Sequence, residues 1–342
     1  MASIVFTAIN ARSLANWSPV LRELGRRGHE MRSLLFPHRG DPDSDGLDDA
    51  VAWCGSAGVF SLRDSLWGAP RATWSEVVAR AIETLERLAP DAVVMTTCHA
   101  GPEHEIPGAW SGQGRRPLFI GCQHGFVQNW EGYWDDFCFD HLLVFGRMFQ
   151  ELAPARVAGR VHVAGLAKLD AIAARPRPAF ADDRRPILFA GQRACTEELV
   201  ALLRDLADAT SREVFVRPHP EHRDAFLDAG LQSLDPCEPL PARIDRCSLV
   251  VTTGSTVVLE AVAAGAPVVV LPLERGQGYE AAGLVAGGLT AADVLAVVES
   301  QADADSPARL RRFLARATGA DGGGRVAMGA DVIERVCAAH EA

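Results

Sequence analysis

The sequence lacks several features that define whole classes of protein. Its 342 residues contain no apolar run near the ~18–20 residues that a membrane-spanning helix needs. Eight cysteines stand singly, with no CxxC pair, which argues against zinc and disulfide frameworks. The net charge of −10 argues against a nucleic-acid partner. Residues 1–8 lack a positive n-region, so we expect a first core strand and a cytoplasmic protein with at most peripheral membrane association.

The composition is that of a globular protein large enough for two domains. Hydrophobic residues make up 48% of the chain and charged residues 23%, and domains commonly hold about 100–200 residues. A proline-rich stretch with Arg and Asp marks a linker. We therefore expect an N-terminal domain over 1–170, a linker over 171–186, a C-terminal domain over 187–325 and a final helix over 326–342.

Strand and helix patterns alternate along both halves. Ser3 to Ala8 is β-rich, Asn10 to Asn16 is expected to be a loop, and Trp17, Val20, Leu21 and Leu24 recur at helical spacing. Further strands are expected at 32–36, 91–96, 117–121, 141–145, 187–190, 213–216, 249–252 and 267–271, and helices at 74–88, 196–207, 257–264 and 326–339. This order predicts two Rossmann-like, doubly wound α/β domains with an interdomain cleft.

In open α/β sheets, ligands bind beyond the carboxyl ends of the strands, and three strand ends carry unusual residues. At the first, Arg217-Pro-His219-Pro, two prolines hold an Arg and a His that can bind phosphate. The alternative is a surface turn with solvated charges.

The second is the small polar loop Thr252-Thr253-Gly254-Ser255-Thr256, which leads into a helix. Hydroxyls and backbone N–H groups at a helix N-terminus favour phosphate, and Glu260 one turn later can accept hydrogen bonds from ribose hydroxyls. Simple capping of the helix by Ser255 or Thr256 is the alternative. The loop is not a Walker A motif, because GK[ST] is absent.

The third strand end is Gln123-His124-Gly125. A His facing a cleft is a plausible general base, so His124 is the first catalytic candidate, and a structural His bonded to a loop carbonyl is the alternative. His99, Glu103, His104 and Glu105 form a second polar cluster, for which we prefer acceptor contact or an auxiliary acid/base role over metal binding.

The third candidate region is an aromatic and acidic loop around Asp135. Trp130, Tyr133 and Trp134 can stack on a sugar, or they can form the packed core of the loop. His124, His99 and Asp135 are therefore the catalytic candidates. No metal and no cofactor are expected.

At this point the residues resemble a known family. Thr7-Ala-Ile-Asn-Ala-Arg12 with the segment from Trp17 to Gly28 is similar to the first βα unit of GT-B glycosyltransferases. The stretch from Leu249 to Pro272 is similar to their C-terminal donor-site strand-loop-helix-strand. Arg217-Pro-His-Pro220 resembles the motif of enzymes with cytidine-linked donors, namely CDP-glycerol glycerophosphotransferases and capsule Kdo and polysialic acid transferases.

The resemblance implies a metal-independent transferase. It would move a sugar or polyol-phosphate from a nucleotide-activated donor, with CMP or CDP favoured over UDP, to a glycan, lipid-linked or protein acceptor in surface glycan synthesis. The implied base is His124. The implied donor site consists of Gly191, Gln192, Arg217, His219, Glu238, Leu240, Thr253, Gly254, Ser255, Thr256 and Glu260. One departure is the absence of the acidic-acidic-Gly motif of the polysialyltransferases.

Two alternatives remain. UDP-N-acetylglucosamine 2-epimerases share the GT-B fold, a His-containing loop and a Ser/Gly-Gly loop with a Glu pair, whereas here only Glu260 follows the loop. A catalytically silent binding protein is the other. The oligomeric state is left open by the sequence.

Overall fold

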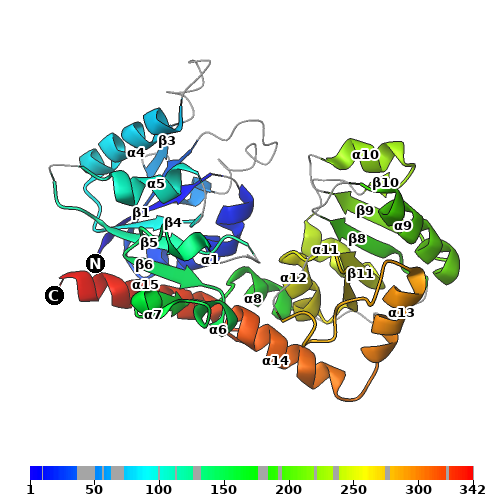
Figure 1. Ribbon diagram of the computed structural model, residues 1–342. Helices are drawn as coiled ribbons and strands as arrows, with labels where there is room; N and C mark the ends of the chain where they lie inside the picture. Colours follow the sequence, from blue (N-terminus) through cyan, green and yellow to red (C-terminus); the bar gives the residue numbers. More distant parts are fainter. Residues whose placement is uncertain are drawn as a thin grey trace. The chain divides into compact units, whose positions relative to one another are not determined.

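The computed structural model describes residues 1–9, 11–36, 51–55, 58–62, 73–98, 101–111, 114–125, 132–175, 184–191, 195–218, 222–233, 239–273, 278–320 and 323–341. Contacts within the chain divide it into two compact units. Unit 1 comprises Met1–Asp170 and Ala317–Ala342, and unit 2 comprises Ala171–Arg316. In Figure 1, unit 1 runs from blue to green and ends in the red helix, whereas unit 2 runs from green through yellow to orange.

Unit 1 contains a seven-stranded parallel sheet in the order β3-β2-β1-β4-β5-β6-β7. The strands are β1 Ser3–Ala8, β2 Glu30–Leu35, β3 Val59–Ser61, β4 Ala92–Met95, β5 Leu118–Cys122, β6 His141–Val144 and β7 Val161–Val163. The central strands β1 and β4 are apolar and almost wholly buried. This is the pattern of strands that are covered on both faces.

The helices of unit 1 cover both faces of this sheet. They are α1 Ala11–Arg26, α4 Trp74–Leu88, α5 Pro102–Ala109, α6 Arg147–Gln150, α7 Ala155–Ala158, α8 Lys168–Ala173 and α15 Arg325–Glu341, with 3-10 turns η2 Ala52–Cys54 and η4 Gly132–Trp134. Helices α4 and α5 pack together on one face, and α1 packs on α15 on the other (Figure 1). After β1 the chain moves toward one edge of the sheet, and after β4 it moves toward the other edge. Because both crossovers are right-handed, α1 and α5 lie on opposite faces of the sheet.

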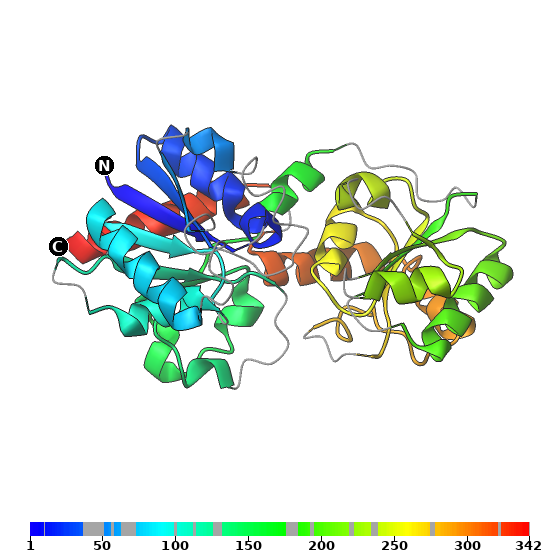
Figure 2. The ribbon, with the colours of Figure 1, turned by 90° about the horizontal axis from the view of Figure 1, so that it is seen from above.

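Unit 2 contains a five-stranded parallel sheet in the order β10-β9-β8-β11-β12. Its elements are β8 Ile187–Gly191, α9 Glu197–Thr210, β9 Val214–Pro218, α10 Arg223–Asp228, β10 Gln232–Ser233, α11 Leu240–Ile244, β11 Leu249–Thr252, α12 Val257–Ala264, β12 Val268–Val270, α13 Ala291–Ser300 and α14 Ser306–Thr318. Helices α11 and α12 pack together, as do α9 and α13, and Figure 2 shows the same unit from above. The predicted pair of doubly wound domains is confirmed.

Local sequence signals explain where several elements begin and end. Helix α4 starts at a capping box, in which the Thr73 side chain accepts from the Glu76 N–H and the Glu76 side chain accepts from the Thr73 N–H. Helix α12 ends at Gly265, whose φ of 77° is the left-handed conformation that glycine adopts freely. Both helices therefore have the predicted bounds.

The expected loop over residues 10–16 is wrong, because α1 already begins at Ala11. Polar Ser13 and Asn16 face inward from this helix, with 6% and 3% of their surfaces exposed. Pro19 lies inside the same helix. A polar segment followed by a proline is typical of a loop in sequence. Here contacts with the rest of unit 1, such as the one between Asn16 and the His124 carbonyl, stabilise the segment as a helix.

The division of the chain differs from the expected one near the C-terminus. Residues 317–325, assigned to the second domain from sequence, group with unit 1. Buried Arg325 donates to Asp170 at 3.0 Å and to the Thr318 carbonyl at 3.2 Å. Asp170 in turn accepts from the backbone N–H groups of Gly324 and Val326. Part of the expected linker, 176–183, lies outside the described residues. Over the described ranges, none of the helices is long and apolar enough to cross a bilayer.

Candidate functional site

The two sheets each have one position where the strand order reverses, and ligands of doubly wound folds bind there. In unit 2 the reversal lies between β8 and β11, because β9 and β10 continue on one side and β12 on the other. Gly191 ends β8 and Thr252 ends β11. The predicted donor-site loop follows Thr252 directly, so it lies at the switch point of unit 2.

The loop from Thr253 to Thr256 is compact and largely buried. Gly254 has a φ of 102°, a conformation that other residues adopt at a cost. The Ser255 hydroxyl accepts the Val257 N–H at 3.2 Å, and the Ser255 carbonyl accepts from the Tyr279 hydroxyl at 3.3 Å. The Ser255 side chain therefore does contact the start of α12, and capping and ligand binding are compatible roles.

A row of three residues crosses the sheet beside this loop. Arg217 in β9 is in register with Ala190 in β8, and Ala190 is in register with Thr252 in β11. Arg217 lies inside the strand, one residue later than the expected end of β9. The Thr252 hydroxyl is buried and has no hydrogen-bond partner within the described part of the chain. Such a group is an unmet hydrogen bond at the ligand edge of the sheet.

Gly191 is required by packing. A Cβ atom at this position would lie 2.4 Å from the Phe189 ring, which itself packs against Phe226. Of the other predicted donor-site residues, Glu260 is 5% exposed on α12 and Leu240 is 8% exposed at the start of α11. Gln192, His219 and Glu238 lie outside the described residues. Their roles stay predictions.

In unit 1 the reversal lies between β1 and β4. Thr7 lies near the end of β1, and the Thr96 hydroxyl after β4 donates to the Thr7 carbonyl at 2.9 Å. Glu103 of α5 is fully buried there, and one of its carboxylate oxygens accepts a hydrogen bond from the Thr7 hydroxyl. Burial raises the pKa of Glu103 to about 7. The switch point of unit 1 therefore holds a carboxylic acid that titrates near neutral pH.

His124 lies one strand away from this switch point, after β5, and is half-buried. Its backbone carbonyl accepts from the Asn16 side chain at 2.6 Å. The neighbouring Gln123 is fully buried and braces the strand end, donating to the Gly125 carbonyl and accepting from the Phe145 N–H, both at 2.9 Å. The strand end is thus rigid, and the role of His124 as a base stays a prediction.

The other two catalytic candidates are less well placed. The Asp135 side chain is 77% exposed and pairs with Arg156 at 3.0 Å on the surface. His99 lies outside the described residues. Trp134, 6% exposed, packs against Tyr133 and Phe137 in the core of the loop. Trp130 lies outside the described residues, and stacking on a sugar stays a prediction. No cluster of three or more potential metal ligands occurs in the described ranges.

Sequence reasoning grouped Glu103 with three other polar residues and missed its distinct position. Glu103 and Glu105 differ by about 200° around a helix, so one points inward when the other points outward. In α5, Glu103 is buried and Glu105 is exposed. The sequence contains no sign that settles which of the two faces the sheet.

Comparison with known proteins supports the fold. No protein-family model matches the chain, and no curated protein matches it. A UDP-GlcNAc 2-epimerase from Neisseria meningitidis, solved with UDP-GlcNAc bound, is 16% identical, with 97% of this chain and 99% of that chain covered and a TM-score of 0.65. A putative UDP-N-acetylglucosamine 2-epimerase from Listeria monocytogenes is 15% identical, with 99% and 96% covered and a TM-score of 0.69.

The calicheamicin glycosyltransferase CalG4 is similar as well. It is 18% identical, with 98% of each chain covered and a TM-score of 0.59. At these identities the likeness concerns the fold and not the activity. Together with the two doubly wound parallel sheets, it shows that the chain has the GT-B fold.

Proposed function

We propose that the chain is an enzyme that acts on a nucleotide-linked sugar and binds the nucleotide phosphates at the switch point of unit 2. The observation that carries this proposal is the buried Thr252 hydroxyl, which has no partner among the described residues and lies beside the loop at the start of α12. An unmet buried hydrogen bond costs about 1–3 kcal/mol. A bound phosphate oxygen would supply the partner, and a helix N-terminus favours such an anion.

The structural neighbours support a uridine nucleotide as the first ligand to test. The Neisseria meningitidis epimerase was solved with UDP-GlcNAc, and it matches this chain over almost the full length of both proteins. The resemblance to cytidine-donor enzymes favours CMP or CDP instead. A thermal-shift panel of UDP, UDP-GlcNAc, CMP, CDP, GDP and ADP separates the two, because a ligand of the native state raises the melting temperature by mass action.

We propose an epimerase-like reaction on a UDP-linked amino sugar. In such a reaction the C2–H bond of the sugar breaks and a C2–H bond forms on the opposite face. Atoms and electrons therefore balance without an oxidant or an acceptor. The chain matches 96–99% of the length of the epimerases from two bacteria, and this match supports the proposed reaction.

The test is incubation with UDP-GlcNAc alone in D₂O. We expect new anomeric signals of the C2 epimer in the proton NMR spectrum, and deuterium at C2 if the abstracted proton exchanges with solvent. If UDP-GlcNAc binds but its sugar stays unchanged, the epimerase proposal is wrong.

A glycosyltransferase is the second candidate, and one observation favours it. The resemblance to the epimerases implies a pair of Glu residues after this loop, whereas here only one acid, Glu260, follows it. The likeness to CalG4 is consistent with it. This candidate predicts that nucleotide is released from a donor only when an acceptor hydroxyl is present. Release measured with and without glycan, lipid-linked and protein acceptors distinguishes the two reactions.

A further inference from the structure

Tyr279 connects a turn near the end of the unit 2 sheet to the loop at the start of α12. It is one of two tyrosines in the sequence and lies in the turn over 278–283, after β12. Its side chain is fully buried, and its hydroxyl donates to the Ser255 carbonyl at 3.3 Å. Ser255 belongs to the loop from Thr253 to Thr256. The tyrosine hydroxyl therefore contacts the backbone of that loop directly.

This contact fixes the orientation of one peptide unit in the loop. The C=O of Ser255 and the N–H of Thr256 belong to the same planar trans peptide, so they point in opposite directions. The Ser255 carbonyl accepts from Tyr279 and, at 3.1 Å, from the Val258 N–H in the first turn of α12. The Thr256 N–H therefore points away from the buried tyrosine ring. N–H groups at the start of a helix have no partner inside the helix, and they favour an anion.

The turn that carries this tyrosine is itself held on two sides. On the side of the sheet, the Val270 N–H of β12 donates to the Leu284 carbonyl at 2.7 Å. On the side of α14, the Arg309 side chain donates to the Ala282 carbonyl at 2.9 Å. The ring of Phe313, also in α14, packs against the tyrosine ring with centroids 5.8 Å apart. The hydroxyl is therefore presented to the loop from a fixed position.

We infer that Tyr279 is a positioning residue for the nucleotide, and that its hydroxyl holds the Ser255–Thr256 peptide in the orientation that phosphate binding requires. This inference rests on the proposed function, because it concerns the same phosphate site. The tyrosine acts through the loop, since its own side chain is fully buried. A loop that is already held in its bound conformation loses less conformational freedom when the ligand binds, and this raises affinity.

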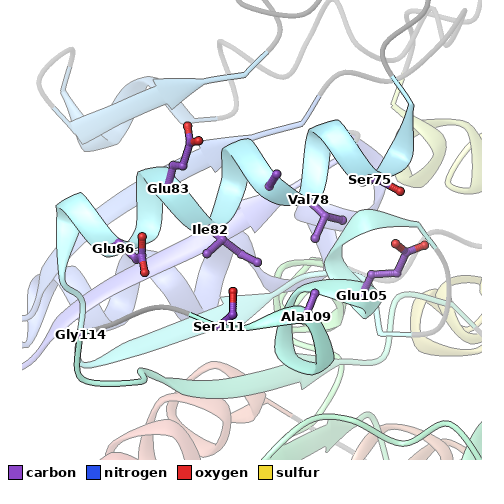
Figure 3. A pocket seen from close by; sticks show the side chains of 10 residues that line it. Ser75, Val78, Ile82, Glu83, Glu86, Glu105, Ala109, Ser111 and Gly114 are labelled. Carbon is purple, nitrogen blue, oxygen red and sulfur yellow. The ribbon is translucent and has the colours of Figure 1, made fainter.

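The open groove between α4 and α5 in unit 1 is a poor place for a nucleotide (Figure 3). Its volume is about 770 Å³, and Glu83, Glu86 and Glu105 line it. None of the described residues that line it is basic. Placing the phosphates of a nucleotide beside carboxylates is unfavourable. A change in nucleotide affinity caused by a variant of Tyr279 therefore reports on unit 2.

The first test is the affinity of Tyr279→Phe for UDP, measured by isothermal calorimetry. The variant loses the hydroxyl and keeps the ring against Phe313. We expect the Kd for UDP to rise about 3- to 10-fold, the effect of one neutral hydrogen bond. If Tyr279→Phe melts at a lower temperature than the parent but binds UDP with the parent Kd, the tyrosine is only structural and the inference is overturned.

Ser300→Ala is the matched control for this measurement. Ser300 belongs to α13 of the same unit, and its hydroxyl donates to the Val297 carbonyl at 2.8 Å. The variant therefore also removes a hydroxyl that donates to a backbone carbonyl, but at a distance along the chain from the loop. Its Kd for UDP should equal that of the parent.

The small number of tyrosines allows a spectroscopic readout of the same contact. Protein labelled with 3-fluorotyrosine should give two ¹⁹F signals, and the signal that disappears in Tyr133→Phe belongs to Tyr133. Addition of UDP should shift the signal of Tyr279, because the hydroxyl contacts the loop that binds the phosphates. A signal of Tyr279 that stays in place while calorimetry shows UDP binding would overturn the inference.

Failure of the proposed function is distinguishable from failure of this inference. If calorimetry detects no nucleotide binding, hydrogen exchange of the Val257 and Val258 amides still reports on the loop, because they donate to the Ser255 hydroxyl and carbonyl. Exchange should be faster in Tyr279→Phe than in the parent and in Ser300→Ala. That result without nucleotide binding would refute the proposed function alone. Equal exchange in all three proteins would overturn the inference, whatever the ligand is.

Discussion

The switch points of the two sheets carry opposite kinds of chemistry. In unit 1, a buried carboxyl group lies between β1 and β4, and hydroxyl and N–H donors face it. In unit 2, a buried hydroxyl without a partner in the described part of the chain lies between β8 and β11, followed by a glycine with positive φ and the start of a helix. Among the described residues, both edges hold a buried oxygen without a hydrogen-bond partner, but in unit 1 it belongs to a titratable acid and in unit 2 to a neutral hydroxyl.

The difference in chemistry indicates a division of roles between the units. A neutral hydroxyl that lacks a partner at a helix N-terminus can bind an anionic ligand, which suits phosphate binding. A buried acid with a pKa near neutral suits control of proton-dependent steps. The same doubly wound topology therefore presents two edges that mutations should affect separately.

The largest expected effect tests whether the units respond independently. Arg325→Met removes a fully buried guanidinium that donates to Asp170 and to the carbonyl of Ala320. Breaking a buried ion pair costs about 3–5 kcal/mol. Hydrogen exchange should show loss of protection in the strands of unit 1 and little change in those of unit 2.

The matched control is Arg175→Met in unit 2. Its ion pair with Asp245, at 3.2 Å, joins side chains that are 41% and 31% exposed. Such pairs contribute about 0–1 kcal/mol, so this variant should resemble the parent. Equal loss of protection in both units for Arg325→Met would contradict the separation of the two units.

The elements that sequence predicted best are those with local signals at both ends. Strand β11 is a continuous apolar run and α12 ends at Gly265, and both bounds were predicted correctly. Helix α1 was predicted to begin too late, because its first turns contain Ser13 and Asn16, and their burial depends on contacts such as the one between Asn16 and the His124 carbonyl.

The site was predictable where backbone geometry dictates it. A small polar loop with Gly254 after a buried strand was recognisable, and the structure places it at the switch point. The Thr252 hydroxyl, which has no partner in the described ranges, and the buried carboxyl of Glu103 were not, because both depend on which groups the folded chain brings within reach. Residue type alone predicts neither.

The second prediction concerns the pH dependence of stability in unit 1. The pKa of Glu103 is raised from 4.5 to about 7 in the folded state. The free energy of unfolding that Glu103 contributes is therefore full below pH 4.5 and is lost as pH rises through 7. The loss amounts to about 3 kcal/mol. Urea unfolding from pH 4 to 8 should show this decline in the parent and not in Glu103→Gln. An identical decline in both would show that another group titrates.

The third prediction sharpens the contrast from the side of unit 2. Thr252→Val replaces a buried hydroxyl, which has no partner among the described residues, by a methyl group of similar size. The free energy of unfolding should rise by about 1–3 kcal/mol, and nucleotide affinity should fall about tenfold or more. Isothermal calorimetry and urea unfolding measure the two effects.

Thr84→Val is the control for Thr252→Val. Thr84 is similarly buried, 8% exposed, but it belongs to α4 of unit 1. Nucleotide affinity should not change in this variant. Higher stability of Thr252→Val with unchanged affinity would place the phosphate contacts elsewhere in unit 2.

The smallest expected effect concerns the His141–His162 pair of β6 and β7, whose ring nitrogens are 3.0 Å apart. Burial, then His141 and Arg335, lower the pKa of His162 to about 4. The stability that the neutral His162 ring contributes to the fold is therefore full above pH 6.5 and is lost as pH falls toward 4. With both rings half-exposed, the loss is about 1 kcal/mol. In a Glu103→Gln background, His162→Gln should reduce the decline in stability between pH 7 and 4.5. Because Glu103 and His162 change stability in opposite directions as pH falls, this background isolates the histidine pair, and an unchanged decline would rule it out.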